Sequence, residues 1–311
     1  MTSDQIIAIL AAAIVAGTPL LYAALGEIIT ERAGIINLGV EGMMLVGAVS
    51  SFTVAVGTGN PWFGVMAAAA AGGAMASIHA FLPISLRANQ VVSGLALTIF
   101  GTGLSGFLGK PMVGIVAPKT LAIINVPALS SIPWLGPIFF RQDGLVYLSY
   151  LIVPLLWFYF YRTRGGLNMR AIGENPAAAD SVGINVFLLR YAYTVIGGAF
   201  AGVAGAYLSL AYAPTWLENM TAGRGWIAVA LVIFAMWDPV KAMLGSYLFG
   251  GIDAMGFRLQ AMGINVISPF FLKMLPYIFT VIVLIIATRQ SLKKHIGAPG
   301  SLGLPYDREE R

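Results

Sequence analysis

The 311-residue sequence contains no cysteine, only two histidines and few charged side chains. Without cysteine the chain can form no disulfide, no thiolate metal site and no cysteine nucleophile. Cysteine content therefore does not indicate whether the protein lies in a reducing or an oxidising compartment. Asp, Glu, Lys and Arg together make up 10% of the residues, whereas soluble globular domains carry about 25%. The shortage of charge excludes an ordinary soluble domain.

The sequence also lacks the motifs of nucleotide hydrolysis and of common hydrolases. A P-loop has the pattern G-x-x-x-x-G-K-[ST], but the nearest approach, Gly109-Lys110, is followed by Pro111, and Leu104 stands where the first glycine should be. There is no nucleophile elbow, no His-Glu-x-x-His and no paired-carboxylate site in a hydrophilic stretch. His79 and His295 have no metal-ligand spacing around them. We expect no catalysis by this chain alone, no cofactor and no metal.

Long apolar runs fill most of the chain instead. Hydrophobic residues make up 58% of it, and the mean hydropathy is +0.84. A membrane-spanning helix needs roughly 20 apolar residues, whereas the strands of a membrane barrel alternate. We therefore predict an all-α fold, a polytopic helical bundle in a membrane. Nine spans, within a range of eight to ten, are expected at about 6–25, 35–57, 62–82, 90–108, 144–161, 190–212, 226–238, 240–257 and 272–288.

Basic residues lie in the loops beside these spans, as membrane orientation requires. With the N-terminus outside and the C-terminus in the cytoplasm, the inner loops hold twice as many Lys and Arg residues as the outer loops. That placement accounts for the net charge of +5 without a nucleic acid partner. Residues 1–290 are predicted to form one transmembrane domain, with an external loop at 110–143 that has interfacial or re-entrant parts. Residues 291–311 are predicted to be a short, mobile cytoplasmic tail.

The one long polar segment between spans is residues 162–190, which carries four arginines. Within it, Asn175 can cap a helix, and Pro176 fits the first helical position, where its missing N–H costs nothing. Gly183 can close the helix in a left-handed conformation. The pattern predicts a short helix near 176–182 that lies outside the bilayer. We expect such a helix to dock onto a soluble partner.

Glu41 is the main ionisable residue inside an apolar run, with Asn37 one helical turn before it. An intramembrane carboxylate costs roughly 3 kcal/mol and must face protein or a water-filled cavity. We expect Asn37 and Arg32 to be its local partners. Three roles are open for Glu41: a polar clamp between helices, a lining of a solute path, or proton coupling.

Further polar or glycine-rich stretches stand at span boundaries. Asn89-Gln90 either caps the fourth span or offers amide groups to a polar solute. The run Thr221–Trp226, which contains Arg224, is either an interfacial anchor or a contact for the solute or for the protein that delivers it. Glycines at 197, 198, 202 and 205 are typical of close helix packing, or of a helix that breaks where it lines a cavity.

Several of these stretches resemble a known family. Glu31–Gly47, ERAGIINLGVEGMMLVG, resembles the signature of permease subunits in ATP-binding-cassette importers, in the branch that serves ribose-like sugars, branched-chain amino acids and nucleosides. Gly173–Ile184, GENPAAADSVGI, is similar to the cytoplasmic coupling loop of that branch, and Asn89–Leu97 and Thr221–Ala228 also match its pattern. The resemblance covers about residues 20–290 and is strongest to the nucleoside-type permeases. Position 90 departs from it, being Gln where many relatives have an acid.

The resemblance implies a permease for nucleosides or related nucleobases that is not itself an enzyme and that couples to a separate ATPase. The helix near 176–182 would be the coupling helix. The residues assigned to ATPase coupling are Arg170, Gly173, Glu174, Asn175, Pro176, Ala177, Ala178, Asp180 and Gly183. Those assigned to the translocation path are Asn37, Glu41, Asn89, Gln90, Arg224 and Trp226.

The resemblance also implies partners and a place in the cell. The expected partners are one or two ATPase subunits, a second and paralogous permease, and an extracytoplasmic substrate-binding lipoprotein. The expected location is the bacterial inner (plasma) membrane, as a multi-pass protein with a cytoplasmic C-terminus. One alternative keeps the machine and changes the cargo to a pentose or a branched-chain amino acid. The others are a membrane enzyme and an ion-coupled secondary transporter, which is disfavoured by the single carboxylate and the lack of a clear repeat.

Overall fold

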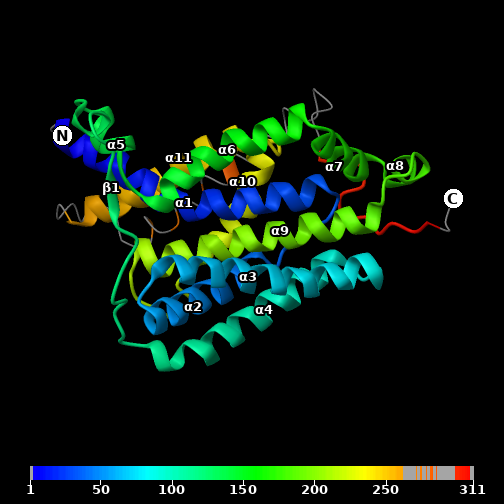
Figure 1. The fold of residues 1–311 in the computed structure, drawn as a ribbon, viewed down its shortest axis with the longest axis horizontal. Coiled ribbons are helices and arrows are strands. Elements are labelled where there is room, and N and C mark those ends of the chain that lie inside the picture. The colour runs from blue at the N-terminus through cyan, green and yellow to red at the C-terminus, as the bar shows by residue number, and fades with distance from the viewer. Residues whose placement is uncertain are drawn as a thin grey trace.

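The computed structural model describes residues 3–261, 271, 274, 278, 281, 282, 285 and 298–308. In this part of the chain, helices lie along one long axis (Figure 1). They are α1 Ser3–Arg32, α2 Val40–Thr58, α3 Pro61–Ala80, α4 Gln90–Gly109, α5 Leu135–Phe139, α6 Gly144–Arg162, α7 Arg164–Glu174, α8 Pro176–Ser181, α9 Val186–Tyr207, α10 Arg224–Ala235 and α11 Pro239–Ala261. Wider π-helical turns, Phe81–Ser85 and Leu208–Tyr212, continue α3 and α9, and 3-10 turns occupy Lys110–Met112 and Leu129–Ser131.

Six of the described helices, counted with their continuing turns, are long and apolar enough to cross a membrane. They are Ser3–Arg32, Val40–Thr58, Pro61–Ser85, Gln90–Met112, Gly144–Arg162 and Val186–Tyr212. They confirm the all-α, multi-pass bundle, but the count of nine is not confirmed. The expected span at 226–238 falls on α10, whose 12 residues extend about 18 Å against a hydrocarbon core of about 30 Å. The span expected at 240–257 falls on α11, outside the six, and the one at 272–288 falls largely outside the described residues.

The two ends of the bundle differ in structure. One end, here called the hairpin end, holds the start of α1, the short α5 and the antiparallel strands β1 Ile123–Asn125 and β2 Arg141–Asp143, in the register Ile123↔Asp143 (Figure 1). Helix α5 and the two strands lie in the segment 110–143 that was predicted to be an external loop. The other end, here called the docking end, holds α7, α8 and residues 298–308. The start of α1 and the polar segment therefore lie at opposite ends, as the predicted orientation requires.

Asp143 fastens the hairpin end to the bundle. Its Oδ1 accepts hydrogen bonds from the backbone N–H groups of Leu145 and Val146 at 2.9 and 3.1 Å, which caps α6. Its Oδ2 accepts from the Tyr207 hydroxyl of α9 at 2.8 Å. Burial raises the pKa of Asp143 above its ordinary value, although these hydrogen bonds act in the opposite direction.

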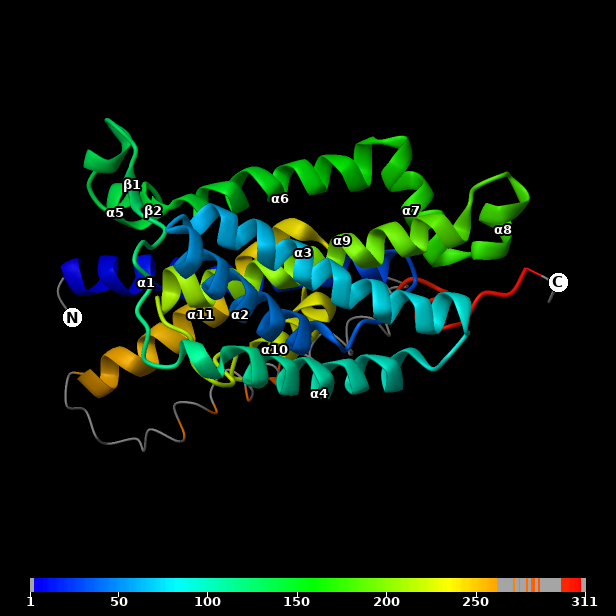
Figure 2. The ribbon, with the colours of Figure 1, turned by 60° about the horizontal axis from the view of Figure 1, so that its bottom comes forward.

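Helix α9 lies at the centre of the bundle and packs against α1, α2 and α3. Figure 2 shows α4 and α6 on opposite sides, with α3 and α9 between them. Glycines of α9 allow the close approach: a Cβ at Gly202 would collide with the carbonyl oxygen of Ala68 in α3, and one at Gly205 with that of Met44 in α2. The close-packing interpretation of these glycines is confirmed.

We expect Gly205→Ala to destabilise the protein, because a methyl group there has no space against the α2 backbone. Overpacking of this kind lowers the free energy of unfolding by about 1–3 kcal/mol, measured by thermal unfolding of the detergent-purified protein. Gly103→Ala in α4 is the matched control, since a Cβ there meets nothing within 4 Å. Equal unfolding temperatures of the two variants would contradict the packing argument.

Candidate functional site

The stretch that resembles the permease signature forms a break between two helices. Helix α1 ends at Arg32, residues 33–39 are not helical, and α2 begins at Val40. Gly34 allows the turn because its φ of +89° lies in the left-handed region that disfavours side chains. Most of residues 33–39, here called the α1–α2 break, are buried. The break therefore places polar backbone groups inside the bundle.

Side chains from four helices bind the backbone of the break. The Ile36 N–H donates to Gln90 Oε1 of α4 at 2.7 Å, and its carbonyl lies 2.9 Å from Nε2 of His79 in α3. Because a carbonyl only accepts, Nε2 of His79 is the donor. The Asn37 N–H donates to Glu27 Oε1 of α1 at 3.0 Å. The carbonyls of Leu38 and Ala33 accept from Thr98 of α4 and Arg190 of α9, at 2.8 and 3.2 Å.

Glu41, in the first turn of α2, holds the start of α10. Its Oε1 accepts from the Thr221 hydroxyl at 2.6 Å and from the Gly223 N–H at 2.9 Å, and its Oε2 accepts from the Gly225 N–H at 2.6 Å. Helix α10 begins at Arg224, so the carboxylate lies where exposed N–H groups and the helix dipole favour an anion. With 7% of its surface exposed, Glu41 is a polar clamp between two helices.

The predicted local partners of Glu41 are wrong. Asn37 lies in the break, where its Oδ1 accepts from the Gly39 N–H at 3.0 Å, and Arg32 donates to the Trp237 carbonyl and the Tyr161 hydroxyl, each at 3.0 Å. The prediction failed because it extended helical periodicity through residues 33–39, whereas residues on opposite sides of a helix break do not share a helical face.

The other residues predicted for the translocation path are spread over two elements. Asn89 caps α4 by accepting from the N–H groups of Val91 and Val92, which confirms its capping interpretation. Arg224 forms an ion pair with Asp253 of α11 at 3.1 Å. Trp226 follows in α10 and is exposed. The structure thus brings the Thr221–Trp226 run to Glu41, whereas Gln90 binds the break and Asn89 caps the start of α4.

Two buried carboxylates, Glu27 and Glu31, lie between the predicted spans 6–25 and 35–57 and were not predicted to be buried. Helix α1 continues through both and buries them, with 1% and 4% of their surfaces exposed. Glu31 Oε2 accepts from the indole N–H of Trp237 at 2.5 Å. Their spacing of four residues on one helical face was the available signal. Glu41 is therefore one of three buried acids near the break.

At the docking end, the predicted short helix is present as α8, Pro176–Ser181. Asn175 ends α7 by donating from its backbone N–H to the Ala171 carbonyl, and it caps α8 by accepting from the Ala178 N–H at 3.0 Å. Gly183 has a φ of +86°, in the left-handed region, as expected. The prediction missed α7, which precedes α8 directly.

The residues predicted to contact an ATPase fall into two groups. Those whose side chains are exposed at the docking end include Asn175, Ala177 and Ala178. The others contact their own chain. A Cβ at Gly173 would collide with the Arg32 carbonyl, so α7 lies directly against the α1–α2 break. The Arg170 guanidinium lies over the Tyr161 ring at 5.7 Å.

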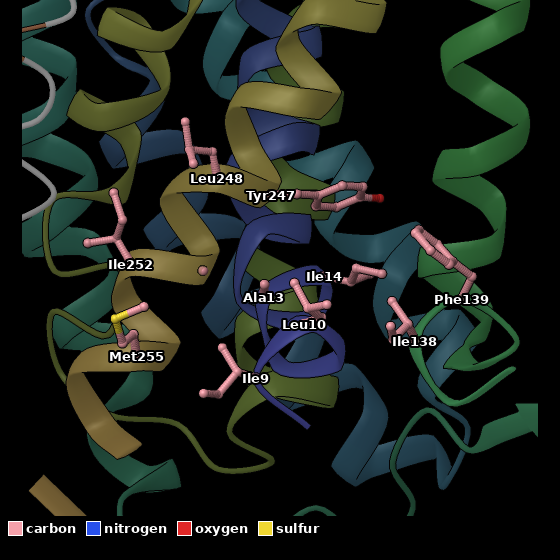
Figure 3. A pocket seen from close by; sticks show the side chains of 11 residues that line it. Ile9, Leu10, Ala13, Ile14, Ile138, Phe139, Tyr247, Leu248, Ile252 and Met255 are labelled. Carbon is pink, nitrogen blue, oxygen red and sulfur yellow. The ribbon is translucent and has the colours of Figure 1, made fainter. Parts of the chain in front are cut away.

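Among the pockets formed by the described residues, two have volumes of about 490 Å³ each. The first lies between α1, α5 and α11 and is lined by apolar side chains together with Tyr247 (Figure 3). The second lies at the hairpin end and is lined in part by Trp62, Lys119 and Thr120. The residues described as lining them include none of those predicted for the translocation path.

We expect Glu41→Gln to weaken the contact between α2 and α10. A glutamine keeps one acceptor oxygen but presents an amide donor to the second N–H, which leaves a buried donor unsatisfied at a cost of about 1–3 kcal/mol. The unfolding temperature in detergent measures the loss. Glu218→Gln, an exposed acid in the loop before α10, is the control and should match the wild type. A Glu41→Gln protein as stable as the wild type would contradict the clamp.

The sequence is similar to known membrane transport proteins. Residues 9–288 match the model of a family described as branched-chain amino acid transport system / permease component. The putative glucose ABC transporter permease protein TsgC13 of Haloferax volcanii is 44% identical, over 97% of this chain and 98% of its own. The nucleoside ABC transporter permease protein NupC of Lactococcus lactis is 36% identical over 96% of both chains. The guanosine ABC transporter permease protein NupQ of Bacillus subtilis is 36% identical over 99% of both. No solved structure gives a significant match.

Proposed function

Because this chain belongs to the family of branched-chain amino acid transport system permease components, we propose that it forms the translocation path of an ATP-driven importer for nucleosides or related nucleobases. The similarity to nucleoside and guanosine permeases over nearly the whole chain supports this cargo. ATP hydrolysis is assigned to a separate subunit. Family membership also argues against an ion-coupled transporter. The number of acidic residues is no longer an argument against one, because the structure buries three of them.

The observation that carries the coupling mechanism is the contact between α7 and the α1–α2 break. The ATPase seats against α8, whose capped start and exposed Ala177 and Ala178 face outward at the docking end. Movement of α8 passes to α7, and from Gly173 to Arg32, the last residue of α1 before the break. The break leads directly into Glu41, which holds the start of α10. Displacement at the docking end thereby reaches a short helix inside the bundle.

This mechanism gives the predicted path residues different roles. Glu41, Arg224 and Trp226 lie where α2, α10 and α11 meet and are the residues we place beside the solute path. Asn37, Asn89 and Gln90 support that region through the break and the start of α4.

The importer needs further subunits. A second, paralogous permease is supported by Bacillus subtilis, in which two guanosine permease proteins resemble this chain, at 36% and 24% identity. An ATPase at the docking end and a substrate-binding lipoprotein at the hairpin end complete the machine. We place the complex in the bacterial plasma membrane, with residues 298–308 on the cytoplasmic side.

A sugar cargo is the second candidate. It is favoured by the 44% identity to a putative glucose permease, a higher value than for the nucleoside relatives. The same docking end and the same break serve either cargo, so the choice depends on the solute contacts and on the binding protein.

Uptake measurements test the proposal. Cells that express the complete complex are given radiolabelled guanosine, glucose, ribose or leucine, with a functional ATPase or with an ATPase unable to hydrolyse ATP. We expect nucleoside uptake that depends on the functional ATPase. Uptake of glucose, ribose or leucine instead would replace the cargo, and uptake independent of the ATPase would overturn the coupling mechanism.

Asn175→Ala should uncouple the machine because it removes the cap of α8. Loss of such a cap costs a helix about 0.5–2 kcal/mol, enough to fray a six-residue helix without unfolding the bundle. We expect a reduced rate of ATPase-driven uptake at an unchanged unfolding temperature.

Asn60→Ala provides a matched control. Asn60 caps α3 in the same way, with a proline following it, but at the opposite end of the bundle. Its replacement should leave uptake unchanged. An equal loss of uptake in both variants would show that capping anywhere in the bundle matters, and the role given to α8 would fail.

A further inference from the structure

Residues 298–308, here called the C-terminal strap, lie bound along the docking end rather than forming the mobile tail that was predicted. The Ser301 N–H and hydroxyl both donate to the carbonyl of Gly173 in α7, at 2.9 and 2.7 Å. The Gly300 N–H donates to Glu174 Oε2 at 3.2 Å. The strap therefore binds the last turn of α7, directly before the predicted coupling helix.

A buried arginine joins the strap to the α1–α2 break. Arg190 of α9 has 2% of its surface exposed, and its guanidinium donates to the Ala33 carbonyl at 3.2 Å, to Ser301 Oγ at 3.0 Å and to the Leu304 carbonyl at 3.5 Å. The Gly303 N–H also donates to the Gly34 carbonyl at 3.3 Å. A buried cation is costly unless its donors are satisfied, and here the strap supplies two of the three acceptors.

The far end of the strap reaches two more elements. Arg308 forms an ion pair with Asp180 of α8 at 2.9 Å. Asp307 forms one with Arg87, in the turn between α3 and α4. The rings of Tyr306 and Phe187 pack at 5.6 Å between centroids. Through these contacts one short segment touches α7, α8, α9, the α1–α2 break and the α3–α4 turn.

We propose that the C-terminal strap is a clamp that makes the docking end move as one body, so that displacement of α8 is transmitted to α3 and α4 as well as to the break. This inference rests on the proposed function. The order of the contacts supports it: hydroxyl, carbonyl and guanidinium contacts are buried at the centre, and charged pairs reach outward to α8 and to the α3–α4 turn. In each outer pair the arginine side chain is more than half exposed and the aspartate is largely covered. Pairs with an exposed partner contribute little to stability, so we assign the outer pairs to linking the strap to α8 and to the α3–α4 turn. Asp307 and Arg87 are positioning residues in this scheme.

Charge reversal tests the link between the strap and the α3–α4 turn. Three variants are assembled in the complete importer in proteoliposomes: Arg87→Asp, Asp307→Arg and the double variant that swaps the two charges. The coupling ratio, which is the uptake per ATP hydrolysed, is measured for each. Aspartate tolerates the left-handed backbone of Arg87, whose φ is +54°. We expect each single variant to lower the coupling ratio severalfold, with basal ATP hydrolysis kept, and the swap to restore it. Arg164→Asp, an exposed arginine at the same end, is the control and should couple as the wild type.

Two results would overturn the clamp. Single variants that couple normally would show that the α3–α4 link is not used. A swapped variant as defective as the single ones, or an equal defect in Arg164→Asp, would show that the charges act on something other than each other.

A cross-linking experiment on the assembled complex does not depend on the proposed cargo. Because the chain has no cysteine, Asp180→Cys and Arg308→Cys together supply a unique pair for a short bismaleimide. The two changes remove the Asp180–Arg308 ion pair, so the cross-linking rate reports whether the rest of the strap keeps position 308 beside α8. A strap that stays bound throughout the cycle predicts the same cross-linking rate with and without ATP. The measurement needs no cargo, and mass spectrometry of the joined peptide gives the rate. Cross-linking that disappears in either state would overturn the clamp. Failure of uptake in the wild type, with cross-linking intact, would instead remove the proposed function and leave the strap in place.

Discussion

The structure depends on the need to satisfy a broken backbone inside an apolar bundle. A backbone N–H or carbonyl that is buried away from water needs another partner, so a buried helix break persists only where protein groups replace the lost hydrogen bonds. In the α1–α2 break these groups come from Glu27, His79, Gln90, Thr98 and Arg190. Most polar residues that stand out in the apolar runs are therefore held by the chain itself. This explains how so many polar groups are tolerated in the bundle.

The same break lies between the two regions that the proposed mechanism joins, the docking end and the start of α10. On its outer side, Gly173 of α7 and the C-terminal strap lie against its first residues. On its inner side it leads into Glu41, whose carboxylate caps a 12-residue helix. A continuous helix from α1 to α2 would have no free backbone for these contacts. The break gives a soluble partner a mechanical route into the bundle, and this is the reason that we place coupling there.

Position 90 shows how the structure changes the meaning of a sequence difference. Gln was unexpected there because many relatives of the resembled family have an acid. In the structure, the atom in use is the side-chain oxygen, which accepts from the Ile36 N–H at 2.7 Å. Glutamine and glutamate both present such an oxygen. The departure from the family pattern therefore keeps the hydrogen bond and does not require a charge.

The sequence by itself determined the fold class, the family and the local chemistry of α8, because apolar run length, Asn175 before Pro176 and Gly183 act within a few residues of the chain. It gave the capping of α4 by Asn89 as one of two interpretations, and the structure shows the cap. Tertiary structure alone decided the partners of Glu41, the burial of Glu27 and Glu31, and the binding of residues 298–308. Those contacts join residues about 10 to 210 positions apart, which no local pattern specifies. The physical reason is that a helix break looks like any other apolar stretch until the groups that satisfy its backbone are assembled around it.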